Sequence, residues 1–353
     1  MQPLETIDVN FKVETNIVKD DICFYSVLQE PFSIHGLRYE NGQFRRMPES
    51  VAESVSPGVH YLHSNTAGGR VRFKTNSQYI AISTKMKNIG KMDHFALTGS
   101  AGFDLYVGEH DKTEFFSTFR PPFDMEDGYQ SLIELTDCNM REVVINFPLY
   151  SDVCELYIGL QKDASVESAA PYALQKPVVF YGSSITQGGC ASRPGNSYPA
   201  ILSRWYDFDY INLGFSGNAK GETNIADYIA GLDMHMFVLD YDHNAPDVQH
   251  LQNTHTAMYQ AVRAAHPDIP IIMMTSPSLS WVLPQHFERR NVIYQTYTDA
   301  INNGDNNVYF WDGSKEFMPY ADYGTVEGCH PNDCGFYGMA KSLSEKFNNI
   351  LSH

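Results

Sequence analysis

The hydrophobic pattern of this 353-residue chain changes its period near residue 165. Before this point, short apolar or alternating runs are separated by Gly, Pro, Asn and Asp at intervals of roughly 8 to 12 residues, which is typical of an all-β sandwich. After it, strand-like runs alternate with stretches of helical spacing, which indicates a parallel sheet covered on both faces. The sequence therefore predicts two domains: a β-sandwich over residues 1–165 and a three-layer α/β/α sandwich over residues 176–353.

The periodicity also predicts the individual elements. In the first half we expect strands at 51–55, 70–73, 79–84, 102–107, 114–119, 131–135, 142–147 and 155–160. In the second half we expect strands at 178–181, 209–213, 236–241, 269–274 and 307–310, and helices near 196–206, 221–230, 247–266, 285–303 and 333–350. Residues 162–177 are small, polar and bounded by Pro, so they are expected to form the linker.

The charge balance restricts the class of partner. Lys and Arg together number 25 against 42 Asp and Glu, for a net charge of -17. Nucleic acids and anionic membranes bind basic surfaces, so neither is expected as a partner. No apolar run is long enough for a membrane span, and the N-terminus has no basic or apolar segment typical of a signal peptide. These features predict a cytoplasmic protein, and its oligomeric state is left open.

The cysteines give no sign of a disulfide framework or a metal cofactor. Without an export signal, all six are expected to be reduced thiols. Cys329, His330 and Cys334 match no common zinc spacing and lack a fourth ligand, so no metal site is predicted.

The first candidate for chemistry follows the strand predicted at 178–181. The apolar run ends abruptly in Gly182-Ser183-Ser184. A small-residue turn after a buried strand lies at the carboxyl edge of a sheet, where α/β folds build their sites. Ser184 is therefore the candidate nucleophile; the alternative is a serine that only caps a helix or satisfies a turn.

Three later blocks follow in order: Tyr-Ile-Asn-Leu-Gly-Phe-Ser-Gly-Asn-Ala at 210–219, Phe-Val-Leu-Asp-Tyr-Asp-His-Asn-Ala-Pro at 237–246, and Glu-Gly-Cys-His-Pro-Asn at 327–332. With Ser184, these blocks resemble the four blocks of the SGNH (GDSL-type) hydrolase superfamily. The resemblance covers the chain from Lys176 to its end. In the first half, Gly102-Phe-Asp-Leu-Tyr106 resembles the Gly-x-Asp-Leu-Tyr signature of a jelly-roll domain that precedes some SGNH esterases.

The resemblance implies a role for each site residue. Ser184 would be the nucleophile and His330 its general base. Glu327 stands where the family usually has Asp, so it would orient His330, or else be a solvated side chain beside a Ser–His dyad. The oxyanion hole would consist of the backbone N–H groups of Ser184 and Gly217 and the side-chain amide of Asn244.

Each of these roles has a plainer alternative. His330 could be a surface-loop histidine, Gly217 an ordinary turn residue and Asn244 a helix N-cap. The third block reads Asp-Tyr-Asp-His-Asn rather than Gly-x-Asn-Asp, so it is aligned on Asn244. Two of the family's usual acidic residues are also replaced, by Ser183 before the nucleophile and by Glu327. Neither change removes the nucleophile, the base or the oxyanion donors.

The implied reaction is transfer of an acyl group to water, with no cofactor. Because the jelly roll favours a carbohydrate alcohol, we expect an intracellular esterase that removes O-acetyl groups from imported oligosaccharides, manno-oligosaccharides first and xylo-oligosaccharides second. The alternatives are a short-chain carboxylesterase or lipase-like enzyme, and a sugar-binding protein with an inactive hydrolase domain. The candidate substrate contacts are Arg193, Trp281, Trp311, Tyr320 and Tyr323. For the aromatic residues the alternative is a core or rim position, and for Arg193 it is a side chain that pins its own loop.

Overall fold

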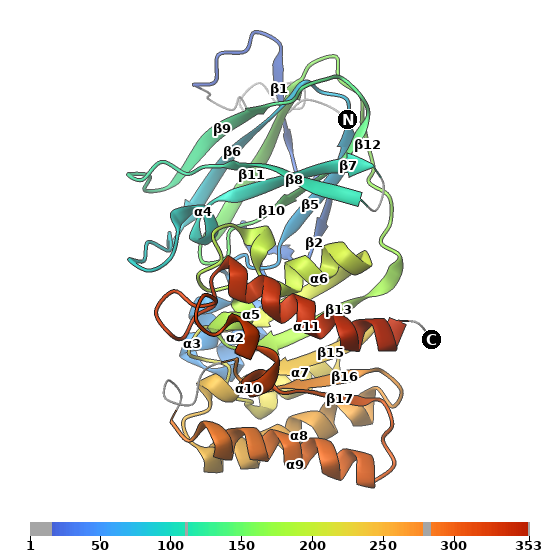
Figure 1. The fold of residues 1–353 in the computed structure, drawn as a ribbon. Helices are drawn as coiled ribbons and strands as arrows, with labels where there is room; N and C mark the ends of the chain where they lie inside the picture. The colour runs from blue at the N-terminus through green and yellow to red at the C-terminus, as the bar shows by residue number, and fades with distance from the viewer. Residues whose placement is uncertain (1–15, 110–111, 278–283, 352–353) are drawn as a thin grey trace. The chain divides into compact units, whose positions relative to one another are not determined.

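The computed structural model describes residues 16–109, 112–277 and 284–351 (Figure 1). The chain divides into two compact units. Unit 1 contains the described parts of Met1–Arg46, Ser64–Tyr172 and Ser192–Gly195. Unit 2 contains the described parts of Met47–His63, Ala173–Ala191 and Asn196–His353.

Unit 1 is built from antiparallel strands in two main sheets. One sheet has the order β1-β11-β6-β9, and the other has the order β12-β5-β10-β7-β8 with β2 paired to β5. Strands β3 and β4 form a separate hairpin. The bounds are β1 Ile22–Ser26, β2 Ser33–His35, β3 Arg38–Glu40, β4 Gln43–Arg45, β5 Arg70–Thr75, β6 Tyr79–Lys87, β7 Phe103–Glu109, β8 Lys112–Phe119, β9 Gly128–Glu134, β10 Arg141–Asn146, β11 Asp152–Gln161 and β12 Val166–Glu167, with a short helix α4 at Leu97–Ser100.

The two sheets of unit 1 share one hydrophobic core. Phe73 and Val143 from one sheet and Ile82 and Ile158 from the other are fully buried in the same cluster. Alternation along each strand brings every second side chain into such a core. This antiparallel sandwich fits the jelly-roll class that the sequence predicts.

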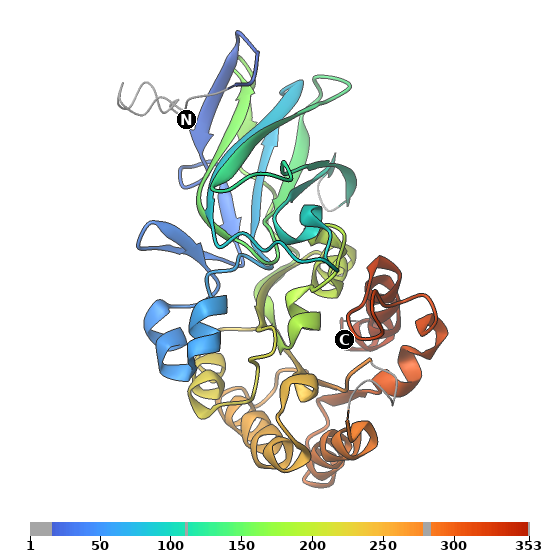
Figure 2. The same ribbon diagram turned by 90° about the vertical axis from the view of Figure 1, so that its left-hand side faces the viewer.

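Unit 2 contains a parallel sheet with the strand order β14-β13-β15-β16-β17. Figures 1 and 2 show helices on both faces of this sheet. The strands are β13 Leu174–Gly182, β14 Phe208–Gly214, β15 Met236–Asp240, β16 Ile271–Met274 and β17 Val308–Trp311. The helices are α2 Glu49–Val55, α3 Pro57–Leu62, α5 Ser184–Gln187, α6 Tyr198–Tyr206, α7 Thr223–Ala230, α8 Val248–Ala265, α9 His286–Asn302, α10 Gly313–Glu316 and α11 Asp333–Leu351, with short 3-10 turns at Pro194–Asn196, Asp242–Asn244 and Met318–Tyr320.

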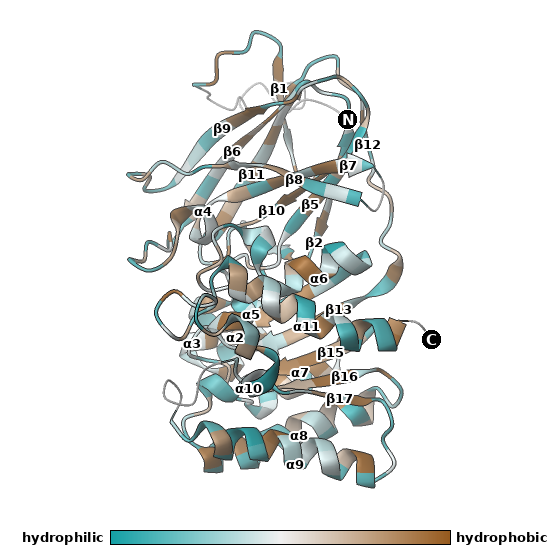
Figure 3. Cartoon of the chain, viewed as in Figure 1, coloured by the Kyte–Doolittle hydropathy of each residue, from teal (hydrophilic) through white to brown (hydrophobic). Residues whose placement is uncertain are grey.

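The central strands of this sheet are buried on both sides. All residues of β15 and β16 are buried, and both strands are strongly hydrophobic in Figure 3. Continuous apolar strands are the expected signature of a parallel sheet covered by helices. The three-layer α/β/α architecture predicted for the second half of the chain is confirmed.

One predicted strand is wrong. Residues 51–55 belong to helix α2. Val51, Ala52 and Val55 have the spacing of a helix face, and all three pack against the hydrophobic core of unit 2. In addition, Asn224 of α7 donates a hydrogen bond to the backbone oxygen of Ser54 at 2.6 Å. The apolar run is thus a helical stripe that packs against an element far away in the sequence.

The division into units differs from the predicted domains in two segments. Residues 47–63 belong to unit 2 although they lie within the first half of the sequence, and residues 192–195 belong to unit 1. The segment predicted as linker is also partly ordered into strands. Val166 and Glu167 pair with β5, and β13 already begins at Leu174.

Candidate active site

Ser184 lies at the carboxyl end of the central strand β13, as the first residue of helix α5. The Ser183 hydroxyl caps this helix by accepting a hydrogen bond from Ile185 N at 3.2 Å. A side chain at Gly182 would approach to 2.2 Å from Thr186 Oγ1 and 2.4 Å from the Asp240 backbone oxygen. Only glycine fits the turn that presents Ser184.

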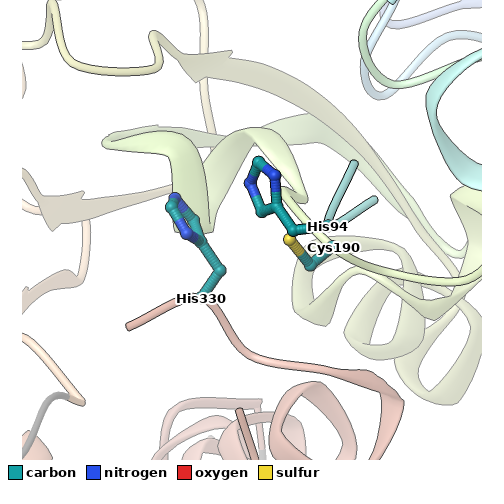
Figure 4. A group of neighbouring side chains, drawn as sticks. All are labelled: His94, Cys190 and His330. Carbon is teal, nitrogen blue, oxygen red and sulfur yellow. The ribbon is translucent and has the colours of Figure 1, made fainter. Parts of the chain in front are cut away.

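His330 and Glu327 come from the loop before α11, and they meet Ser184 in unit 2. Ser184 Oγ lies 2.9 Å from His330 Nε2. The Nδ1 atom of the same ring contacts Glu327 Oε1, and His330 N donates to this carboxylate at 3.2 Å. Figure 4 shows His330 beside α5, together with Cys190 from the loop that follows this helix. The structure brings the predicted Ser, His and Glu together as a hydrogen-bonded chain.

The charge state of Glu327 suits this arrangement. Partial burial favours the neutral carboxyl, but the hydrogen bonds and charge of His330 outweigh it and lower the pKa of Glu327. A carboxylate at this position accepts the Nδ1 proton, so Nε2 presents its lone pair to Ser184. In this tautomer His330 can remove the hydroxyl proton of Ser184.

The predicted oxyanion donors come from the loops after β14 and β15. Gly217 has a φ of 68°, where residues with a Cβ are strained, and a Cβ built there would meet nothing within 4 Å. The Asn244 amide donates to the Phe215 oxygen at 2.9 Å, which ties it to the Gly217 loop. An amide nitrogen carries two N–H groups, so the other one is the candidate oxyanion donor. Helix α8 is capped by Asp247, not by Asn244.

A buried polar network beneath the nucleophile is absent from the sequence predictions. Thr186 Oγ1 donates to Asp240 Oδ2 at 2.8 Å, and Tyr198 lies within hydrogen-bond distance of both side chains. Burial raises the pKa of Asp240 well above its ordinary value. These contacts fix α5 to the end of β15. A polar residue at the end of an otherwise apolar strand is the signal that could have identified Asp240.

A second missed contact joins the third and fourth sequence blocks. The partly buried His243 ring has Nδ1 at 3.0 Å from Ser276 Oγ and Nε2 at 3.2 Å from Cys329 Sγ. Burial lowers the pKa of His243 to about 4 and raises that of the neighbouring Asp242 to about 6. The His243 ring is therefore neutral near pH 7. The sequence feature that could have identified His243 is its position in Asp-Tyr-Asp-His-Asn, the block that differs from the family pattern.

The side chain of Arg193 is occupied within unit 1. Its Nη1 donates to Asp104 Oδ2 at 3.1 Å and to the Tyr106 hydroxyl, and its guanidinium carbon lies 3.7 Å from the centre of the Phe115 ring. Asp104 also accepts from Gly195 N at 2.8 Å. These bonds give Arg193 the loop-pinning role that was the alternative to a substrate contact. They also show Asp104 satisfying a turn.

The aromatic candidates separate into different environments. Trp281 lies outside the described residues. The prediction of Trp311 as a substrate contact is not supported, because the ring is fully buried and its Nε1 donates to Ser342 Oγ at 2.9 Å. A sugar platform needs an accessible ring face. Tyr320 is partly buried, whereas Tyr323 is 77% exposed.

Two family models match the chain, one in each half. The model of the GDSL-like lipase/acylhydrolase family matches residues 175–348, and the model of the N-terminus of SGNH-hydrolase-type esterases, named after its GxDLY motif, matches residues 22–166. The chain belongs to the GDSL-like lipase/acylhydrolase family. It is thus an esterase or acylhydrolase of the SGNH type, as the sequence blocks predicted. Among curated proteins, none matches this sequence.

Solved structures share the fold over nearly the whole chain. A protein described as a GDSL-like lipase from Bacteroides ovatus is 28% identical, with a TM-score of 0.84 over 94% of this chain and 98% of that one. The salicylyl-acyltransferase SsfX3 from a tetracycline biosynthetic pathway is 19% identical, with a TM-score of 0.75 over 94% and 98%. A family two carbohydrate esterase from Clostridium thermocellum, in complex with cellohexaose, is 15% identical, with a TM-score of 0.61 over 91% and 99%.

Within the described residues, no helix has both the length and the apolar character that crossing a bilayer requires. The cytoplasmic location stays a prediction.

Proposed function

We propose that this SGNH-type hydrolase is a serine esterase that removes O-acetyl groups from carbohydrates through an acyl-enzyme on Ser184. The observation that carries the proposal is the hydrogen-bonded chain Ser184–His330–Glu327, in which Ser184 Oγ lies 2.9 Å from His330 Nε2. A serine hydroxyl needs an adjacent base, and the base needs a third group to orient it. His330 is the base here, and Glu327 is the orienting group.

The reaction proceeds in two halves. His330 Nε2 takes the proton of Ser184 Oγ as this oxygen attacks the ester carbonyl, and the same proton then goes to the leaving alcohol. The backbone N–H groups of Ser184 and Gly217 and the Asn244 amide stabilise the oxyanion. In the second half, His330 activates a water molecule that cleaves the acyl-enzyme and frees Ser184.

Support for a carbohydrate alcohol comes from three observations. Unit 1 is a jelly-roll-like sandwich, and its family model is that of an esterase N-terminus. A carbohydrate esterase with the same fold is known in complex with cellohexaose. Tyr323, in the segment just before the Glu327 loop, is 77% exposed, which suits stacking on a sugar.

A two-stage assay tests the proposal. The first stage compares p-nitrophenyl esters from acetate to decanoate, and we expect the acetate to give the highest kcat/KM. The second stage measures acetate release from acetylated manno- and xylo-oligosaccharides. We expect kcat/KM on one of these sugars to exceed that on the aryl acetate. Preference for long acyl chains, or no acetate release from either sugar, would contradict the proposal.

A further inference from the structure

The loop that carries His330 also gathers a set of metal-ligating atoms. One ligand atom each from Glu327, Cys329 and His330 lies within 4.8 Å of the other two. Zinc bonds of 2.0–2.3 Å in tetrahedral geometry separate neighbouring ligands by roughly 3.3–3.6 Å. Glu327 and His330 are already in contact, so small shifts of about an ångström would bring the three side chains to these separations.

The backbone fixes these three residues in one tight turn. Val326 N donates to the His330 oxygen at 2.9 Å and Gly328 N donates to Thr325 Oγ1 at 3.2 Å. Gly328, between two of the candidate ligands, has a φ of 89°. The turn therefore presents Glu327, Cys329 and His330 to the same space without a long loop that would have to become ordered.

A contact from a different loop, made by His243, holds the Cys329 sulfur in place. The ring is partly buried, and its Nε2 lies 3.2 Å from Cys329 Sγ while its Nδ1 lies 3.0 Å from Ser276 Oγ. When Ser276 donates to Nδ1, the proton of the neutral ring is on Nε2 and points at the sulfur. Hydrogen bonds of this kind orient metal ligands and stabilise a bound thiolate.

We propose that Glu327, Cys329 and His330 form an inhibitory Zn²⁺ site, with His243 as the hydrogen-bond donor to the Cys329 sulfur. A thiolate, an imidazole and a carboxylate are ligands that zinc accepts together, and a site with three protein ligands leaves a fourth position for water. Because His330 Nε2 faces Ser184, the metal takes Nδ1. The ion replaces the contact between Glu327 and His330 rather than adding to it.

Metal binding and catalysis are then mutually exclusive. On binding, the Cys329 thiol releases its proton to solvent, and the proton on His330 Nδ1 moves through solvent to Nε2. With Nε2 protonated, His330 cannot accept the proton of Ser184, and Glu327 no longer orients the ring. The loss of activity rests on the proposed function, whereas the metal site itself does not depend on which ester is cleaved.

The test combines direct zinc binding with p-nitrophenyl acetate hydrolysis on the full-length protein, after EDTA treatment and removal of the chelator. We expect calorimetry to show one zinc site in the wild type, hydrolysis to fall with the same midpoint, and EDTA to restore it. Cys329→Ser should weaken zinc binding at least about 100-fold, because it removes a ligand rather than a supporting hydrogen bond. Cys334→Ser, an exposed thiol on α11, is the matched control and should keep the wild-type affinity and rate.

A footprint on the wild type covers the case in which Cys329→Ser does not fold. Zinc should protect Cys329, but not Cys334, from iodoacetamide, as measured on peptides by mass spectrometry. Unchanged affinity in folded Cys329→Ser, or no protection of Cys329, would overturn the site. Binding at this site without loss of hydrolysis would overturn the inhibitory role. If the metal-free enzyme cleaves no ester, the proposed function fails, while the binding and footprint measurements still decide the metal site.

Discussion

The carboxylate of Glu327 contacts His330 Nδ1 from the same turn, three residues earlier in the chain. The family pattern has Asp at this place, yet the longer Glu side chain still reaches the ring. Its carboxylate also accepts the backbone N–H of His330 at 3.2 Å. This second bond fixes the carboxylate against the loop and offsets the extra freedom of the additional methylene.

Removal of the Glu327 carboxylate should slow catalysis without abolishing it. We expect Glu327→Ala to lower kcat roughly 10- to 10³-fold, less than His330→Ala, because the base remains but its tautomer and orientation are no longer fixed. Glu327→Asp should recover part of the loss. The measurement is kcat for p-nitrophenyl acetate across the pH profile. A Glu327→Ala rate equal to wild type at every pH would make Glu327 a bystander and leave a Ser184–His330 dyad.

The side chain of Asn244 should matter more for kcat than for KM. An oxyanion donor acts in the transition state, so Asn244→Ala should lower kcat about 10²- to 10³-fold with little change in KM. The same substitution also removes the bond from Asn244 to the Phe215 oxygen. The melting temperature therefore has to be measured in parallel. An unchanged kcat in a folded variant would remove Asn244 from the oxyanion hole.

Gly217 can be tested against a glycine with a similar backbone. Gly217 and Gly304 have φ values of 68° and 91°, and a Cβ at either would meet nothing within 4 Å. Alanine at each position should cost about 1–2 kcal/mol of unfolding free energy through backbone strain. Only Gly217→Ala should also lower kcat, by roughly 10-fold or more, because it displaces a donor at the site. Equal kcat values for the two variants would contradict an oxyanion role for Gly217.

Asp242 should leave a signature in the pH dependence of stability. Burial raises its pKa from 3.8 to about 6 in the folded state, so its contribution to stability is present at low pH and is lost as the pH rises through this window. Asn at this position does not ionise, so Asp242→Asn does not lose stability as the pH rises. Relative to wild type, the variant should gain up to about 3 kcal/mol between pH 4 and pH 6.

Urea unfolding from pH 4 to pH 7 measures this difference. His243 and His255, whose pKa values burial lowers to about 4 and about 3, contribute the opposite slope in both proteins. The difference between variant and wild type therefore isolates the Asp242 effect. Parallel stability curves for the two proteins would show that Asp242 titrates normally in the folded chain.

Local patterns made much of the fold and the central site predictable. Strand-end turns and ordered blocks identified Ser184 and His330, because the carboxyl ends of parallel strands share one edge of the sheet. The apolar period separated the β-rich half from the α/β half. Where the local period was ambiguous, as in 51–55, the prediction failed because the partner of this helix, α7, lies far away in the sequence.

Contacts between distant polar residues could not be predicted in this way. The His243–Cys329 and Thr186–Asp240 contacts span 86 and 54 residues, and no periodic pattern encodes them. The burial of Trp311 likewise depends on Ser342 of α11, which accepts its indole N–H. Composition marks an aromatic residue as a candidate platform, but only the packing of neighbouring elements decides whether its face is accessible.

The role of Ser184 as nucleophile is tested most directly by comparing its chemistry with that of its neighbour Ser183. Ser184→Ala should lower kcat for p-nitrophenyl acetate at least ~10³-fold and prevent labelling by a fluorophosphonate probe, because the nucleophilic oxygen is gone. Ser183→Ala should cost about 1 kcal/mol of stability through the lost helix cap, yet still be labelled. Near-wild-type turnover by a folded, uncontaminated Ser184→Ala enzyme, or probe attachment at another residue, would contradict the assignment of Ser184 as the nucleophile.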